Sequence, residues 1–143
     1  MSKKYNQMEE KFINATTKRP EGERTMDAAL VTIDVNSFIE LIKKEESWEE
    51  GDRNAITVFK TNGMRIVLIA LRKGAKMNKH KADGLICLQV LEGQIEFKTD
   101  EQTVELVKGQ MLTLHEAILH DVLAKEETIF LLTLTTTLEN KSN

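Results

Sequence analysis

The chain has 143 residues, a hydrophobic fraction of 41% and a formal net charge of -3 at pH 7. A chain of this length forms one domain of ordinary size and can bury a core without disulfides or a structural metal. Acidic and basic residues are interspersed, without the basic stripe and interleaved aromatic residues that suit a phosphate backbone. We therefore expect no nucleic-acid partner.

The beginning of the sequence is basic and then turns acidic where a signal peptide would need its apolar stretch. No run approaches the roughly 20 apolar residues that a membrane-spanning helix needs. These features predict a cytoplasmic protein with no membrane partner. The single cysteine, Cys87, excludes an intramolecular disulfide, and its apolar neighbours predict that it is a buried small hydrophobe.

The first part of the chain is predicted to carry few elements. Residues 1–25 form a polar arm, in which a short helix around residues 6–14 is compatible with the pattern. Residues 28–35 are rich in β-branched and apolar side chains and predict a strand. Asn36 or Ser37 can then cap a helix that lies on the barrel with its apolar side inward. The apolar residues at helical spacing are Phe38, Leu41, Ile42 and Trp48.

From Asn54 onward the pattern changes to short β runs that are separated by turn signals such as Asn62-Gly63 and Glu92-Gly93. Closely spaced runs of this kind predict an all-β barrel or sandwich. The predicted strands are 55–60, 64–72, 85–91, 94–99, 103–107, 111–114, 121–124 and 128–135. The predicted organisation is a polar arm at 1–25, a strand and helix packed on the barrel at 26–53, the barrel at 54–137 and a polar tail at 138–143.

Several of these strands are apolar on both faces. In 85–91, Leu85, Cys87 and Leu91 lie on one face and Ile86, Leu88 and Val90 on the other. One face fills the barrel, so the second needs cover from the helix, another sheet or another subunit. We expect a homodimer, because one short helix is small for this task. Whether the N-terminal strand crosses to the partner subunit stays open.

Two groups of glycine and histidine residues in the second half carry a family resemblance. Gly74, His80 and Gly93 have the spacing of the first motif of the cupin superfamily, and Gly109 and His120 have that of the second. The chain therefore resembles a small, single-domain, RmlC-like cupin barrel over about residues 54–135. The resemblance implies a cupin-type double-stranded β-helix, also called a jelly-roll barrel, with the short helix packed on it.

The sequence departs from the family's pattern at five motif positions. The family's metal site consists of three imidazoles and one carboxylate, and it suits a divalent transition metal. Ala82 stands where the family has its second His ligand, and Ile86 stands where it has its Glu ligand. The matched ligands are therefore His80 and His120. The other departures are His115 for Pro, Ala117 for Gly and Ala124 for Asn.

His115 is the candidate for a third ligand, because it precedes His120 across a predicted turn. If its imidazole turns inward, His80, His115 and His120 form a three-nitrogen site, with Glu116 or Asp121 nearby. The alternative interpretation leaves His115 at a strand end, exposed or hydrogen-bonded, and the pocket free of metal. The cofactor is accordingly either none or one weakly bound divalent transition metal.

The preferred functional hypothesis is a small-molecule-binding barrel without a full metal site. Ile86 shares a face with Leu88, so the floor of the pocket is apolar where a metal cupin has a carboxylate. The predicted pocket residues are His80, Ala82, Ile86, Leu88 and His120. The alternative is a metal-dependent oxygenase or isomerase that uses the three histidines. A third possibility is metal-free catalysis by a His base, so whether the protein is an enzyme stays open.

Overall fold

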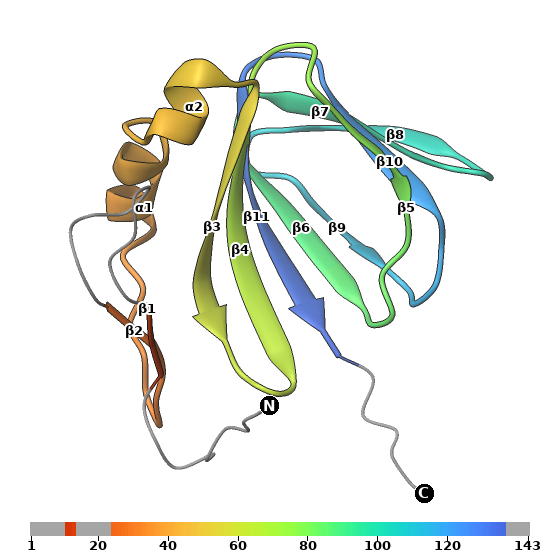
Figure 1. Cartoon of the computed structure of the whole chain (residues 1–143). Helices are drawn as coiled ribbons and strands as arrows, with labels where there is room; N and C mark the ends of the chain where they lie inside the picture. Colours follow the sequence, from red (N-terminus) through yellow and green to blue (C-terminus); the bar gives the residue numbers. More distant parts are fainter. Residues whose placement is uncertain (1–10, 14–23, 137–143) are drawn as a thin grey trace, which may run out of the picture.

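The structure is a computed structural model, and it describes residues 11–13 and 24–136. Within these residues two short strands and two short helices precede a longer series of β-strands (Figure 1). The strands are β1 Lys11–Ile13, β2 Arg24–Asp27, β3 Arg53–Lys60, β4 Met64–Leu71, β5 Lys76–His80, β6 Ile86–Glu92, β7 Gln94–Thr99, β8 Thr103–Val107, β9 Met111–Leu114, β10 His120–Ala124 and β11 Thr128–Thr135. The helices are α1 Val35–Ile42 and α2 Glu46–Glu50.

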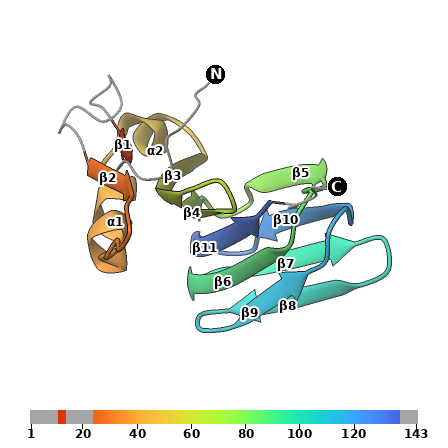
Figure 2. The ribbon, with the colours of Figure 1, turned by 90° about the horizontal axis from the view of Figure 1, so that it is seen from below.

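Two antiparallel sheets face each other across an apolar core. The five-stranded sheet has the order β3-β4-β11-β6-β9, and the four-stranded sheet has the order β5-β10-β7-β8. The helices lie on the side of the five-stranded sheet that faces away from the four-stranded sheet (Figure 2). The predicted all-β jelly roll with helix packed on it is confirmed. The helical segment is divided into two helices, and Trp48 belongs to the second.

Two neighbouring interior strands of the five-stranded sheet, β4 and β11, explain the layered arrangement. Leu71 and Phe130 point into the core between the sheets, whereas Leu68 and Ile129 point into a second core beneath the helices. Because both faces of these strands are apolar, each face must be covered by another layer. The four-stranded sheet covers one face and the helices cover part of the other.

Polar contacts fix the helices on the sheet. Asp34 caps α1, where its carboxylate accepts hydrogen bonds from the backbone and the hydroxyl of Ser37. The buried side chain of Asn54 on β3 donates to the carbonyl oxygen of Ile42, 3.0 Å away. The guanidinium of Arg72 lies 4.1 Å from the ring centroid of Trp48 and donates a hydrogen bond to the backbone carbonyl oxygen of Trp48. The contacts of Asn54 and Arg72 tie α1 to β3 and α2 to the end of β4.

The structure corrects three predictions in the N-terminal part. The strand predicted at 28–35 is wrong, because β2 ends at Asp27 and α1 already begins at Val35. The cap is Asp34 rather than Asn36 or Ser37, both of which lie within the helix. The carboxylate of Asp34, directly before Val35, caps the helix two or three residues earlier than predicted.

The prediction of a helix around residues 6–14 is wrong at 11–13, which form β1 and pair with β2. The rest of that prediction lies outside the described residues. In the described part of the chain, no helix is long and apolar enough to cross a membrane.

All eight strands predicted after residue 54 are present, with ends shifted by no more than two residues. The prediction missed β5, which pairs with β10 at the edge of the four-stranded sheet. Its sequence, Lys76-Met-Asn-Lys-His80, has no β-branched residue, and all of it except Met77 is exposed. Such a strand is held by backbone pairing with its neighbour, which a propensity-based prediction does not detect.

The outer surface of β6 and β9 extends beyond the helices. Cys87 is half-buried there, which differs from the predicted full burial. Leu85, just before β6, and Met111 on β9 are 45% and 53% exposed. The homodimer stays a prediction, which a measurement of the protein's mass in solution tests.

Gly93 forms the tight connection between β6 and β7. Its φ of 91° lies in the left-handed region that L side chains rarely adopt. A Cβ atom at this position would collide with the carbonyl oxygen of Glu127 and with Thr128. The fully buried hydroxyl of Thr128 accepts a hydrogen bond from the backbone N–H of Gln94 at 3.1 Å. Gly93 therefore allows the hairpin to pack directly against the start of β11.

We predict that Gly93→Ala lowers the free energy of unfolding by ~2 kcal/mol or more, through backbone strain and the collision. Gly63→Ala is the matched control, because a Cβ atom there meets nothing within 4 Å. Its effect should stay within about 0.5 kcal/mol. Urea denaturation of both variants measures the difference. Equal stabilities would contradict the assigned role of Gly93.

Candidate functional site

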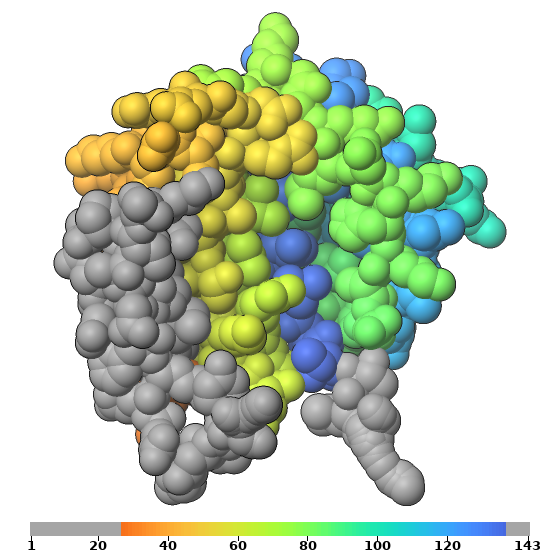
Figure 3. Space-filling model, in the orientation of Figure 1, coloured from red at the N-terminus to blue at the C-terminus, as the bar shows by residue number. Residues whose placement is uncertain are grey.

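A cavity of about 1100 Å³ opens between the two sheets. Its walls come from β3 and β4 on one side, from the end of β5 and the loop to β6 on the other, and from β11 between them. Figure 3 shows this hollow, with β11 visible between the β3–β4 hairpin and the β5 segment. The volume is large enough for a small organic molecule.

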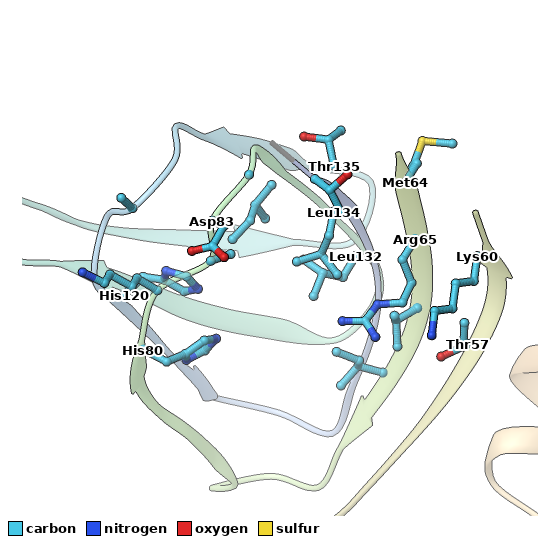
Figure 4. A pocket seen from close by; sticks show the side chains of 18 of the residues that line it. Thr57, Lys60, Met64, Arg65, His80, Asp83, His120, Leu132, Leu134 and Thr135 are labelled. Carbon is cyan, nitrogen blue, oxygen red and sulfur yellow. The ribbon is translucent and has the colours of Figure 1, made fainter. Parts of the chain in front are cut away.

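His80 and His120 lie together in the wall of this cavity. His80 is the last residue of β5 and His120 the first of β10, and antiparallel pairing places the two directly opposite each other. Their ring centroids are 4.4 Å apart, and the ring planes are tilted by 56°. Figure 4 shows both side chains on the same side of the cavity. The structure thus places both predicted pocket residues, His80 and His120, in the cavity wall.

The hydrogen bonds of the two imidazoles determine their neutral tautomers. Nδ1 of His80 lies 2.7 Å from the carbonyl oxygen of Asn78, and Nδ1 of His120 lies 2.9 Å from that of Ile118. A carbonyl oxygen only accepts hydrogen bonds, so both Nδ1 atoms carry the proton. Each neutral ring then has a lone pair on Nε2, with which it can accept a hydrogen bond from a ligand.

The environment of His120 favours the neutral form. Its residue surface is only 3% exposed, and its ring stacks on Phe97 with a centroid distance of 5.2 Å and an interplanar angle of 11°. Burial lowers the pKa of His120 below its ordinary value of 6.5, and nearby His80 acts in the same direction. The hydrogen bond to Ile118 opposes this effect. The buried ring is therefore a hydrogen-bond acceptor rather than a cation at neutral pH.

Three other residues were predicted to belong to the pocket. Ala82 and Ile86 line the cavity beside the histidines. Leu88 does not line it, because it lies one alternation further along β6 and is 1% exposed within the core between the sheets. Its inclusion in the pocket is therefore wrong, although Leu88 and Ile86 point to the same side of β6 as predicted.

His115 lies outside the cavity, so the predicted three-histidine site is not formed in the structure. Leu112 and Leu114 of β9 pack against the core, and by alternation the next residue points outward. The side chain of His115 is 86% exposed, and its Nδ1 lies 3.4 Å from the Oε1 atom of Glu116. The interpretation of His115 as an exposed residue at a strand end describes this geometry.

Ala117 and Ala82 connect the two loops that border the histidine side. The backbone N–H of Ala117 donates to the carbonyl oxygen of Ala82 at 2.9 Å. Ala117 has a φ of 61°, a left-handed conformation in which glycine is favoured. The family resemblance places a glycine at this position, and a left-handed backbone is one that glycine adopts readily.

The cavity wall also carries a group of polar residues that were not predicted from the sequence. Arg65, Lys60 and Asp83 line the cavity in addition to the predicted residues. Arg65 could have been found, because strand alternation places it on the same face as Val67 and Ile69. Lys60 could not, because a β-bulge changes the direction of its side chain. Further lining residues are Thr57, Leu132 and Leu134.

Solved structures resemble this fold, whereas no protein-family model and no curated protein matches the sequence. A cupin superfamily protein from Desulfitobacterium hafniense aligns with a TM-score of 0.64 and 16% identity, over 89% of this chain and 99% of that one. A conserved protein of unknown function from Streptococcus pyogenes aligns with a TM-score of 0.63 and 21% identity, over 80% of this chain and 93% of that one.

The protein has the cupin fold. A third similar structure is a salicylate 1,2-dioxygenase from Pseudaminobacter salicylatoxidans, with a TM-score of 0.53 and 20% identity. That alignment covers 58% of this chain and 26% of the dioxygenase. Cupin barrels thus include proteins of different or unknown activity, and the cupin fold alone assigns none to this chain.

The residues at the cupin metal position do not fit a metal centre. Two imidazoles are present, but the other two motif positions carry the methyl group of Ala82 and the alkyl side chain of Ile86. Among the residues that the structure describes, no group of three or more His, Cys, Asp or Glu side chains could hold a metal ion. Transition-metal sites in proteins generally use three or four such ligands.

We predict that the lowered pKa of His120 makes stability depend on pH. As the pH falls below about 6.5, the unfolded chain binds a proton at this residue before the folded protein does, so the free energy of unfolding decreases. His120→Phe, which keeps a ring against Phe97, should flatten this decrease. Urea denaturation at about pH 7.5 and about pH 5.5 measures it.

His115→Phe is the control, since it removes an imidazole that is largely exposed. It should leave the pH dependence of unfolding close to that of the unsubstituted protein. An unchanged dependence in His120→Phe would contradict the assignment of the effect to the buried ring.

Proposed function

We propose that this cupin-fold protein binds a small organic molecule in the cavity between its sheets without using a metal ion. The observation that carries the proposal is the pair of imidazoles at one end of a cavity whose wall is partly apolar and partly polar. With Nδ1 of His80 and His120 engaged by backbone carbonyls, the Nε2 atoms are the acceptors available to a ligand.

The rest of the wall favours a ligand with an apolar body. Val67, Ile69 and Ile86 form apolar surface from two neighbouring parts of the five-stranded sheet, and Leu132 and Leu134 of β11 lie between them. Pockets of this type bind mainly through apolar contact, while a few polar groups fix the orientation of the ligand. A hydroxyl or amine on the ligand can donate to Nε2 of His80 or His120.

The alternative, a metal-dependent oxygenase or isomerase, requires a third ligand that the chain does not bring to the histidine pair. His115 is directed away from the cavity, and Ile86 occupies the carboxylate position of the motif. The similarity to a salicylate dioxygenase therefore supports a cavity that accepts small molecules more than it supports that enzyme's chemistry.

We predict well below one equivalent of Fe, Mn, Ni, Cu or Zn per chain after purification and after reloading followed by gel filtration. Two imidazoles bind such ions weakly compared with a complete ligand set. Elemental mass spectrometry measures the content, with His80→Ala and His120→Ala as variants and His115→Ala as the control. Near-stoichiometric metal that is lost in the first two variants and kept in the control would contradict the proposal.

We predict that small molecules with an apolar ring and a hydroxyl group bind in the cavity. In an NMR screen of the isotope-labelled protein, the amide signals that shift should include those of Gly84, Ile86 and Ala117, which line the cavity. Ala82→Trp should abolish these shifts by filling space between the loops, whereas Ala29→Trp, at an exposed position outside the cavity, should not. Shifts that persist in Ala82→Trp would contradict the proposed location.

A further inference from the structure

Two cationic side chains lie next to each other in the cavity wall, away from the histidine pair. Lys60 on β3 and Arg65 on β4 are directly opposite each other in the antiparallel pairing, and both line the cavity. In Figure 4, the guanidinium of Arg65 extends into the cavity from β4 toward the side that carries His80 and His120. Both residues are exposed at the cavity opening.

A β-bulge brings Lys60 to this position. The register of β3 with β4 shifts between Thr57 and Phe59. Before the bulge, Ile56 and Val58 point outward into the core beneath the helices, and regular alternation would send Lys60 to the same side. The extra residue reverses the alternation, so Lys60 lines the cavity together with Thr57.

A like-charged pair of this kind is unfavourable unless an opposite charge is close. The other sheet shows the usual solution. Glu96 and Glu105 are directly opposite on β7 and β8, and the Nζ atom of Lys125 lies 3.7 Å from a carboxylate oxygen of each. In the described part of the chain, neither Lys60 nor Arg65 has a carboxylate within salt-bridge distance.

The remaining charges of the cavity wall do not supply the counterion. Lys81 adds a third cation, and Asp83 is the one carboxylate among the described lining residues. Figure 4 places Asp83 on the side of His80 and His120, across the cavity from Lys60. Since charges of one sign that line the same side of a cleft add their fields, the β3–β4 side presents a positive potential to a ligand.

We propose that the ligand of this cavity is a small organic anion, whose carboxylate binds between Lys60 and Arg65. This inference rests on the proposed function and adds the chemical class of the ligand. An apolar body then lies along Val67, Ile69 and Leu132, and a hydroxyl group at its far end donates to Nε2 of His80 or His120. The ligand class is a hydroxy acid in which an apolar spacer separates the carboxylate from the hydroxyl group.

Isothermal titration calorimetry with matched probes tests the proposal. The probes are 4-hydroxybenzoate, 4-hydroxyphenylacetate and 3-(4-hydroxyphenyl)propionate, each compared with its uncharged amide of nearly the same shape. At low ionic strength, at least one acid should bind about tenfold more tightly than its amide, a difference of about 1.4 kcal/mol. Added salt should reduce the difference, because exposed charge pairs are screened.

The variants locate the effect. Arg65→Gln and Lys60→Gln should each remove most of the preference for the acid over the amide, while the amide's affinity stays unchanged. Lys98→Gln, which alters the net charge equally at an exposed position of β7 outside the cavity, should keep the preference. A preference that survives in both cavity variants would overturn the proposed anion site.

Two further outcomes separate this inference from the proposed function. The anion inference would be overturned if the acids and their uncharged amides bound equally while the NMR shifts of the protein's backbone stayed confined to the cavity. That result would leave the small-molecule site in place. Failure of every acid and amide to bind would count against both proposals.

Discussion

The structure depends on the fact that β4 and β11 are apolar on both faces, because such strands must lie in the middle of three layers. Their inner side chains, such as Leu71 and Phe130, meet the four-stranded sheet, and their outer ones, such as Leu68, meet the helices. The two sheets stay apart where β3, β4 and the loop after β5 border the cavity. The same layering therefore produces both the core and the cavity.

The cavity joins two chemically different ends through this arrangement. Pairing of β5 with β10 sets His80 opposite His120, and pairing of β3 with β4 sets Lys60 opposite Arg65. One end carries two imidazoles and the other carries cations, with Val67 and other apolar side chains between them. The proposed ligand, a molecule with two unlike ends, matches the two ends that these pairings create.

Much of the barrel could be predicted from the sequence, because strands such as 64–71 and 128–135 have long β-rich runs bounded by turn residues. The strand β5 could not, since its polar residues are held by pairing with β10. The histidine pair was predicted because spacing from Gly74 and Gly109 survives in the sequence. Lys60 was missed because its direction depends on a bulge, which side-chain alternation alone does not reveal.

The central claim is that the two imidazoles face a ligand rather than a metal, and a crystal structure of the purified protein without added metal tests it most directly. Anomalous difference maps collected at the absorption edges of the transition metals should show no peak between the rings of His80 and His120. Electron density for an organic molecule in the cavity would support the account further. A strong anomalous peak about 2.0–2.1 Å from both Nε2 atoms would contradict it.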